Sequence, residues 1–443
     1  MERATIFAPA TGKGPAGIAI VRISGPQSGA ALGALVGRAP VPRHATRARL
    51  CDPASGEALD DGLVLWFPAP GSVTGEDVVE LQIHGGRASV EAVCGALARQ
   101  PGLRLAEPGE FTRRAFDNGK LDLTAVEGLS DLIAAETDAQ RRQALRQLDG
   151  DLGRLYESWR GEVLRALALV EAEIDFPDED LPGGLTAAAR AALDGCARAI
   201  DRHLGDARRG ERLRDGIQIA IIGPPNAGKS SLLNALARRE AAIVSETPGT
   251  TRDVIEVHLD LAGYPVVVAD TAGLRRAADG VEAEGVRRAL ARAEAADFKI
   301  LVLDAGDGAP GAEITALIGD DTLVVFNKVD VVGLSDLPEL VGVVAPTAIS
   351  VKTGENLDAL LRAIGKRAAA EFDIGRDIPL TRHRHRAALE DCRSALGRAL
   401  DGAEIELVAE DVRLAARTLG RITGRIDVED VLDVIFGEFC IGK

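Results

Sequence analysis

A glycine-rich loop reads GPPNAGKSS over residues 223–231 and has the composition of a phosphate-binding loop. Its glycines let backbone N–H groups turn toward phosphate oxygens, and the helix that follows favours negative charge at its N-terminus. We expect Lys229 to reach the β- and γ-phosphates of a nucleotide and Ser230 to bind Mg²⁺. The loop predicts the following nucleotide-binding residues: Asn226, Ala227, Gly228, Lys229, Ser230 and Ser231.

Three further motifs follow the loop in the order typical of guanine-nucleotide-binding proteins. They are DTAG, NKVD and SVKTG, which begin at Asp270, Asn327 and Ser350. The Asp270 carboxylate can hold the hydration shell of Mg²⁺, and the Gly273 amide can contact the γ-phosphate. Asp330 can accept hydrogen bonds from two guanine N–H groups that adenine lacks, although an isolated aspartate in a loop is usually only solvated. The motifs add these predicted GTP-binding residues: Asp270, Thr271, Ala272, Gly273, Asn327, Lys328, Asp330 and Ser350.

The group that orients the attacking water is harder to assign. Leu274 follows DTAG, where Ras-like enzymes keep the glutamine that performs this task. Thr251, in the PGTTRD segment, is expected to be the second Mg²⁺ ligand, in a loop that orders only with a triphosphate. The segment after Leu274 offers Glu282 and Glu284 as polar groups. The residues alone leave these two open, and Glu282 also fits a plain role at a helix end.

Length and composition limit the classes of protein that fit. With 443 residues, 46% of them hydrophobic, the chain is too long for one ordinary core and should form about two to four domains. The net charge of −16 means that an RNA contact needs a local basic patch or a partner protein. The five cysteines are far apart and form no zinc or redox spacing. We expect a cytoplasmic location without membrane contact, because neither a signal peptide nor a membrane-spanning apolar run occurs.

The texture of the chain predicts a multidomain architecture. Residues 1–118 are rich in Gly and Pro and predict an α+β domain, while 119–213 and 373–443 read as two halves of an α-helical domain. Residues 214–372 alternate strands and helices and predict an inserted α/β P-loop GTPase domain with a mostly parallel sheet. The expected strands cover residues 18–23, 63–67, 78–83, 217–222, 254–261, 265–269, 299–303, 322–326 and 343–349.

Two apolar stripes at helical spacing predict how the helical halves meet. One stripe consists of Leu152, Leu155, Trp159, Val163, Leu167, Val170 and Ile174, and the other of Leu407, Val408, Val412, Ala415, Leu419 and Ile422. Neither stripe can stay exposed to water, so the two halves should pack on each other.

The basic stretch TRHRHR at 381–386 leaves two interpretations open. It could bind RNA phosphate groups, or it could be the solvated start of a helix. No aromatic residues are interleaved for base stacking, which favours the solvated helix start.

The motifs together resemble the MnmE family, also called TrmE, of bacterial tRNA-modification GTPases. The resemblance runs nearly from end to end and is carried by the GTPase motifs together with VRISG, GEDVVELQIHGG, EPGEFTRRAF, NGKLDL and FCIGK, which begin at residues 21, 75, 107, 118 and 439. It implies a folate-binding N-terminal domain similar to that of aminomethyltransferases, a helical domain and an inserted GTPase domain. It also implies a homodimer formed through the N-terminal domains, whose GTPase domains meet transiently in the presence of GTP and K⁺.

The resemblance also implies residue roles. It places K⁺ at the Asn226 side chain and at Ser245, Thr247 and Thr250, the last three partly through backbone carbonyls, and it favours Glu282 over Glu284 as the residue that orients water. For a tetrahydrofolate derivative it implies Arg22, Glu80, Lys120 and Lys443. Cys440 stays open between one-carbon chemistry and packing as a small apolar group.

The function implied by the resemblance is modification of tRNA. Together with the FAD-binding partner MnmG, in a heterotetramer, such a protein forms the 5-carboxymethylaminomethyl or aminomethyl group on the wobble uridine of certain tRNAs. Folate is then the one-carbon donor, NADH reduces the partner's flavin, and GTP hydrolysis drives a change of conformation. The alternative is a GTP-dependent assembly or regulatory switch of the ribosome-maturation type, without a direct role in modification.

Overall fold

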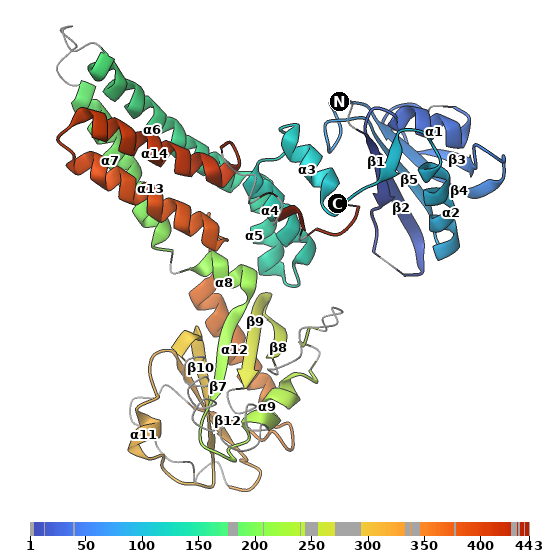
Figure 1. The fold of residues 1–443 in the computed structure, drawn as a ribbon. Helices are drawn as coiled ribbons and strands as arrows, with labels where there is room; N and C mark the ends of the chain where they lie inside the picture. The colour runs from blue at the N-terminus through green and yellow to red at the C-terminus, as the bar shows by residue number, and fades with distance from the viewer. Residues whose placement is uncertain are drawn as a thin grey trace, which may run out of the picture. The chain divides into compact units, whose positions relative to one another are not determined.

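The chain divides into two units, each assembled from segments that are distant in the sequence (Figure 1). The first unit contains Met1–Ser130, Arg146–Leu193 and Ala395–Lys443, and the second contains Asp131–Leu145 and Asp194–Ser394. The computed structural model describes residues 4–12, 14–38, 40–175, 185–206, 208–239, 241–243, 256–270, 294–332, 337, 346–375, 378–426, 432, 435–437 and 439–442.

The N-terminal part of the first unit is a six-stranded sheet in the order β3-β4-β5-β2-β1-β6. Its pairs are antiparallel except for β1 with β6. Its strands are β1 (Thr5–Pro9), β2 (Ala16–Ser24), β3 (Thr46–Cys51), β4 (Ala58–Phe67), β5 (Val78–Gly85) and β6 (Leu103–Leu105), and its helices are α1 (Ser28–Val36) and α2 (Arg87–Ala98).

The core of this sheet follows from the alternation of side chains along each strand. Val21 of β2 and Val79 and Leu81 of β5 are fully buried in one apolar cluster with residues of α1 and α2. The intervening residues Arg22 and Glu80 therefore project from the opposite face of the sheet. This face carries the polar groups that the sequence singled out.

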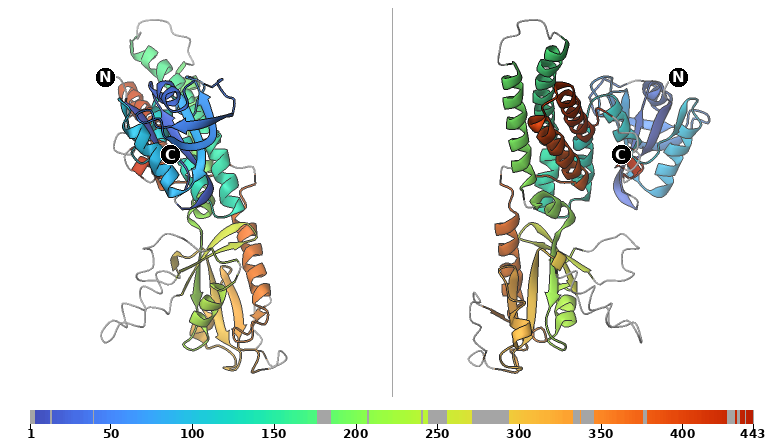
Figure 2. Two further views of the ribbon diagram at one scale, coloured as in Figure 1. Left: turned by 90° about the vertical axis from the view of Figure 1, so that its right-hand side faces the viewer. Right: turned by 60° about the vertical axis from the view of Figure 1, so that its left-hand side comes forward.

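In the first unit α6 packs along α14, and the two helices lie side by side in Figures 1 and 2. The helices of this part of the chain are α3 (Glu110–Asp117), α4 (Leu123–Ala134), α5 (Asp138–Leu148), α6 (Asp151–Asp175), α7 (Leu185–Leu204), α13 (His383–Asp401) and α14 (Ile405–Thr423), of which α4, α5, α7 and α13 contribute to both units. This packing confirms that the two helical halves meet. Leu407 does not belong to the buried stripe, because 61% of it is exposed, and the buried residues of α14 begin at Ala409.

The C-terminal segment of the chain packs within the same unit. Phe436 and Phe439 share an apolar cluster with Leu123 and Val126 of α4. Ile441 forms an antiparallel bridge with Pro108, so the C-terminal segment lies beside the segment that precedes α3.

The second unit contains a six-stranded sheet in the order β12-β11-β10-β7-β9-β8. All pairs are parallel except β8 with β9, which confirms the mostly parallel sheet expected from the sequence. Its strands are β7 (Ile217–Ile222), β8 (Glu256–Leu261), β9 (Tyr264–Asp270), β10 (Phe298–Asp304), β11 (Thr322–Asn327) and β12 (Thr347–Ala348), and its other helices are α8 (Arg209–Asp215), α9 (Lys229–Leu236), α11 (Ala312–Thr315) and α12 (Leu357–Phe372). Of the strand expected over 343–349, residues 343–345 lie outside the described residues and only Thr347–Ala348 is a strand.

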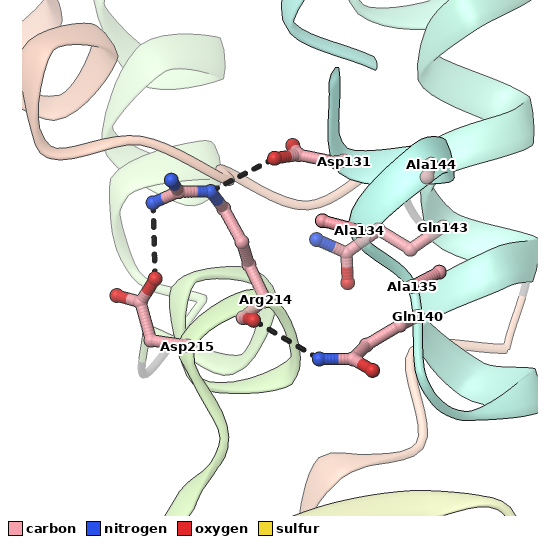
Figure 3. A pocket seen from close by; sticks show the side chains of 8 residues that line it. All are labelled: Asp131, Ala134, Ala135, Gln140, Gln143, Ala144, Arg214 and Asp215. Carbon is pink, nitrogen blue, oxygen red and sulfur yellow. Dashed lines mark hydrogen bonds and ion pairs between the residues drawn. The ribbon is translucent and has the colours of Figure 1, made fainter. Parts of the chain in front are cut away.

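The short helix α8 leads into β7, and a carboxylate on α4 binds it (Figure 3). Asp131 Oδ1 accepts hydrogen bonds from Arg214 Nε at 3.0 Å and from an Arg382 guanidinium nitrogen at 2.7 Å. Gln140 Nε2 donates to the Arg214 carbonyl at 3.1 Å. Arg214 precedes β7 and Arg382 follows α12, so one carboxylate binds both segments that flank the second sheet.

The TRHRHR stretch is neither a solvated helix start nor a free basic patch. Arg386 is only 7% exposed and donates to Asp206 at 2.9 Å and to Glu211 at 3.2 Å. His385 is fully buried, and Arg382 is bound to Asp131. The expectation of a solvated segment was wrong, because these charges are matched by carboxylates from segments far away in sequence that no local pattern reveals.

Candidate functional site

The phosphate-binding loop connects β7 to α9, and two of its residues must be glycine. Gly223 has φ of +138° and Gly228 has φ of +99°, conformations that other residues rarely adopt. A Cβ atom on Gly223 would overlap the carbonyl of Val302, and one on Gly228 would overlap the side-chain amide of Asn327. At these two glycines the loop is therefore packed closely against Val302 and Asn327.

Lys229 lies over this loop at the start of α9. Its ammonium group donates to the carbonyls of Gly223 at 2.9 Å and of Pro224 at 2.7 Å, and the residue is buried. Ser230 follows it in the first turn of the helix, while Asn226 is exposed in the loop with φ of +66°. The positive charge, the helix start and the exposed amide thus surround one concave stretch of backbone.

Asn327, at the end of β11, connects three of the motifs. Its side-chain amide donates to the Ala227 carbonyl at 2.8 Å, and its Oδ1 accepts from the Val351 N–H at 3.1 Å. Its buried side chain thus fixes the NKVD segment to the phosphate-binding loop and to the SVKTG loop. The structure brings together three segments, and Asn327 lies 100 residues from Ala227 and 24 residues from Val351 in the chain.

Asp330 is positioned by Ser350. The fully buried Ser350 hydroxyl donates to Asp330 Oδ1 at 2.7 Å and accepts from the Thr353 N–H at 3.2 Å. The Ser350 hydroxyl orients the Asp330 carboxylate through one of its oxygens. Because Asp330 is exposed, the carboxylate can still reach solvent. A carboxylate fixed in this way can pair with two N–H groups on the edge of a flat ring.

Lys328 points to a second acid that the sequence reading missed. Its ammonium group forms an ion pair with Asp304 Oδ2 at 2.5 Å. Burial alone would raise the pKa of Asp304, but the hydrogen bonds from Lys328 and from the Gly306 N–H, together with the charge of Lys328, outweigh it and lower this pKa. Asp304 ends β10 in a short DAGDG segment, and nothing local in that segment indicated a partner across the sheet.

Several predicted residues lie outside the described residues. They are Ser245, Thr247, Thr250, Thr251, Thr271, Ala272, Gly273 and Glu282 of the GTPase domain and Lys443. Asp270 is described only as the backbone end of β9. Their assigned roles stay predictions.

A second group of predicted residues lies on the face of the N-terminal sheet opposite α1 and α2. Arg22 and Glu80 are direct partners on β2 and β5, and Glu80 Oε1 accepts from Arg22 Nε at 3.1 Å and from a terminal nitrogen at 2.9 Å. Their side chains are 23% and 19% exposed, and the guanidinium carbon lies 5.9 Å from the centroid of the Phe111 ring. The pair therefore presents a carboxylate and a cation together at one half-buried place.

Lys120 lies beside the loop at Thr74–Glu76, where the GEDVVELQIHGG motif begins. Gly75, with φ of +78°, packs against Asn118 and Lys120, and Asn118 Nδ2 donates to the Thr74 carbonyl at 2.6 Å. The buried Arg114 holds the same loop through Glu76 at 2.9 Å. Arg114 is thus a buried arginine that supports the loop.

Cys440 is exposed and adjoins Ile441, which bridges to Pro108. Cys94 is less exposed than Cys440, and burial raises the pKa of the Cys94 thiol to about 11. Among the described residues, no cluster of three His, Cys, Asp or Glu side chains forms a metal site, and no helix is long and apolar enough to cross a membrane.

Comparison with known families matches two profiles to this chain. Residues 123–440 match the MnmE helical domain, and residues 5–120 match the N-terminus of the GTP-binding protein TrmE. The tRNA modification GTPase MnmE of Parvibaculum lavamentivorans is 58% identical over 99% of this chain and 100% of its own length. The protein of the same name from Rhodospirillum rubrum is 57% identical over 99% of both chains.

Solved structures with similar folds include two GTP-binding proteins. Era from Aquifex aeolicus, bound to GDP and AlF4⁻, is 27% identical and aligns over 42% of this chain and 68% of its own with a TM-score of 0.28. The G domain of the FeoB iron transporter from T. maritima is 24% identical over 35% of this chain and 98% of its own, with a TM-score of 0.24. TM-scores of this size carry no argument, and the assignment of the site depends on its own geometry and on the full-length relatives.

Proposed function

The chain belongs to the MnmE family of tRNA modification GTPases, and we propose that its GTPase cycle drives a folate-dependent modification of the wobble uridine in tRNA. The chain is an enzyme that hydrolyses GTP and acts in tRNA modification. The finer assignments below are proposals, supported by the two groups of residues described above.

The proposed nucleotide site places the phosphates over the loop at 223–228. Lys229 and the first N–H groups of α9 are proposed to face the phosphates. Because glycine has no side chain, the phosphates can approach the backbone at Gly223 and Gly228. Ser230 fits a ligand of Mg²⁺, which neutralises charge on the β- and γ-phosphates when bound. Thr251 and Asp270 complete this proposed set, and Gly273 is proposed to contact the γ-phosphate.

Asp330 is the proposed guanine-reading residue, and its contact with Ser350 is the observation that carries the assignment. The hydroxyl fixes one oxygen of the carboxylate, so that the group can face the base edge without rotating. Replacing Asp330 by Asn should lower affinity for guanosine diphosphate relative to xanthosine diphosphate, because an amide can donate to the second carbonyl of xanthine. An unchanged ratio of the two dissociation constants would remove Asp330 from this role.

Hydrolysis is proposed to need K⁺ and Glu282. The exposed amide of Asn226 is a suitable oxygen ligand for K⁺, with Ser245, Thr247 and Thr250 as the other proposed contributors. Positive charge there would stabilise the charge that develops on the phosphates in the transition state, and Glu282 would orient the water that Leu274 cannot orient. GTP turnover should be much faster in K⁺ than in Na⁺, and Glu282→Ala should abolish turnover while GTP affinity changes little. Equal turnover in the two salts would contradict the K⁺ site.

The N-terminal sheet is proposed to bind a tetrahydrofolate derivative at Arg22 and Glu80. A pterin ring presents neighbouring N–H groups that can donate hydrogen bonds to a carboxylate. The glutamyl tail is an anion that can pair with Arg22, Lys120 or Lys443. The half-buried ion pair supports this proposal, because it holds both charges at one place with little exposure. Titration calorimetry with a reduced folate tests it, and absence of binding would contradict it.

The C-terminal segment is proposed to bring Cys440 to the same domain. The bridge between Ile441 and Pro108 supports this placement. Removing residues 441–443 should weaken folate binding, and an unchanged affinity would show that the segment only packs.

The partners of this chain are proposed to be a second copy of itself and the FAD-binding protein MnmG, with NADH reducing the flavin. GTP hydrolysis would then change the conformation of the assembly rather than form a bond on the uridine. Nucleoside analysis of tRNA from cells lacking this chain tests the proposal. Loss of the 5-carboxymethylaminomethyl or aminomethyl group is expected. Unchanged amounts of both modified nucleosides would favour the assembly switch instead.

A further inference from the structure

Asp304 is an acid in the GTPase domain to which neither the sequence motifs nor the family assignment gives a role. It is the last residue of β10 and pairs in register with Asn327, the first residue of NKVD, on the neighbouring parallel strand. Its side chain is 17% exposed. The position is thus the same edge of the sheet at which the nucleotide motifs converge.

Two contacts fix the Asp304 carboxylate. Oδ1 accepts from the Gly306 N–H at 3.0 Å, which orients the group within its own turn. Oδ2 then meets the Lys328 ammonium at 2.5 Å. The carboxylate is therefore held by backbone on one side and holds a side chain of NKVD on the other.

Lys328 needs such an anchor because its backbone turns sharply. Its φ of +68° lies in the left-handed region, which a residue with a long side chain seldom adopts, and its side chain is 40% exposed. An unanchored lysine at an exposed turn samples many rotamers, and fixing them during binding costs free energy.

We propose that Asp304 is a positioning residue of the nucleotide site, which acts through Lys328 by holding the lysine side chain in place to support the guanine base. The proposal rests on the guanine-binding role of NKVD. It predicts that nucleotide affinity depends on the charge of Asp304 only while Lys328 is present.

The same two strands provide a matched control at the opposite edge of the sheet. Lys299, the second residue of β10, forms an ion pair with Asp321, which directly precedes β11, at 2.7 Å. This pair has the same chemistry and joins the same strands, but it lies at the edge away from the nucleotide motifs. It separates the role of an ion pair in sheet stability from a role in nucleotide binding.

The experiment measures dissociation constants for GDP in the full chain carrying Asp304→Asn, Asp321→Asn or Lys328→Gln, and in the double variant of Asp304 and Lys328. Asparagine keeps the acceptor for Gly306 and removes only the charge. We expect Asp304→Asn to weaken GDP binding about tenfold, as for a charged hydrogen-bonded contact, and Asp321→Asn to leave it unchanged. In the Lys328→Gln background, Asp304→Asn should have no further effect.

Three results would overturn the proposal. They are an unchanged GDP affinity in Asp304→Asn, an equal loss in both lysine backgrounds, and an equal loss in Asp321→Asn. Thermal unfolding checks that each variant is folded, and Asp304→Ser, which retains an acceptor oxygen, replaces Asp304→Asn if that variant is not.

The Asp330→Asn variant distinguishes this failure from failure of the guanine site. If Asp330→Asn changes the preference between guanine and xanthine nucleotides while Asp304→Asn has no effect, only the positioning role of Asp304 is wrong. If Asp330→Asn also has no effect, the guanine assignment of NKVD fails, and the role of Asp304 fails with it.

Discussion

Two carboxylates in this molecule are proposed to read the edge of a nitrogen ring, and their surroundings differ. Asp330 follows a parallel strand, is exposed, and is oriented by the neutral hydroxyl of Ser350. Glu80 lies within an antiparallel strand and is paired with the cation of Arg22 across the ladder. The first site keeps a full negative charge for its ligand, whereas the second presents both charges together.

The difference suggests two ways of building specificity. At the end of parallel strands, several loops contribute backbone groups, so that glycine conformations and buried amides define the site. On the face of an antiparallel sheet, register alone places opposite charges side by side. We expect the first site to be sensitive to backbone changes and the second to changes of charge.

The largest expected effect comes from Gly228→Ala. The new methyl group would overlap the Asn327 amide at a residue with φ of +99°, so the loop must distort. We expect GTP affinity to fall by about a hundredfold or more, measured with a fluorescent nucleotide, while reduced folate still binds. A loss of less than about threefold would show that the glycine cradle does not define the site.

A smaller effect is expected from Glu80→Gln. The change keeps an acceptor oxygen but removes the negative charge that pairs with the Arg22 guanidinium and the proposed second acceptor oxygen for the pterin, so folate affinity should fall about tenfold with GTP affinity unchanged. Glu91→Gln is the matched control, since Glu91 pairs with Arg87 on the exposed surface of α2. Equal losses in the two variants would mean that Glu80 has no special role.

Ser350→Ala tests the neutral hydroxyl that donates to Asp330 in the nucleotide site. Without the hydroxyl, Asp330 loses its orienting donor but keeps its charge, so we expect about a fivefold loss of GDP affinity. The ratio of GDP to xanthosine diphosphate affinity should stay close to that of the native chain. A collapse of that ratio would mean that Ser350 itself contributes to base discrimination.

The smallest expected effect concerns the pH dependence of stability, and it tests His203 of α7, which belongs to neither proposed site. Burial lowers the pKa of His203 to about 4; Asp206 opposes the shift, while His385 and Arg386 add to it. Because the unfolded chain binds a proton near pH 6.5 and the folded chain does not, stability falls as the pH drops below that value.

Lowering the pH from about 7.5 to about 5.5 should cost about 1 kcal/mol through this group. Chemical denaturation at the two values measures it, with His203→Gln as the variant in which this share of the pH dependence disappears. An unchanged pH dependence in that variant would assign the effect to other groups.

The sequence predicts the GTPase sheet well, because strand and motif coincide there. Ile217–Ile222 is a strand with the predicted bounds, and Asn327 ends its strand where a nucleotide-binding residue must lie. Gly223 and Gly228 are recognisable because their spacing reflects a backbone requirement that does not depend on the rest of the fold.

Contacts between distant segments could not be predicted in this way. The partners Asp304 and Lys328 lie on neighbouring strands, and their pairing depends on register rather than on a motif. Arg386 illustrates the same limit, because its carboxylate partners belong to a different helix and a preceding turn. Local composition predicted a solvent-exposed side chain for Arg386, whereas tertiary packing buries it.

Asp131 has a consequence for the order in which the chain assembles. It holds Arg214 and Arg382, so the ends of the GTPase domain meet at one point while the helices α6 and α14 are separated by the whole inserted sequence. Domains fold as units from the N-terminus during synthesis, and contacts distant in sequence form slowly. We therefore expect the nucleotide-binding sheet to be folded before α14 is synthesised, and the pairing of α6 with α14 to be among the last steps on the ribosome.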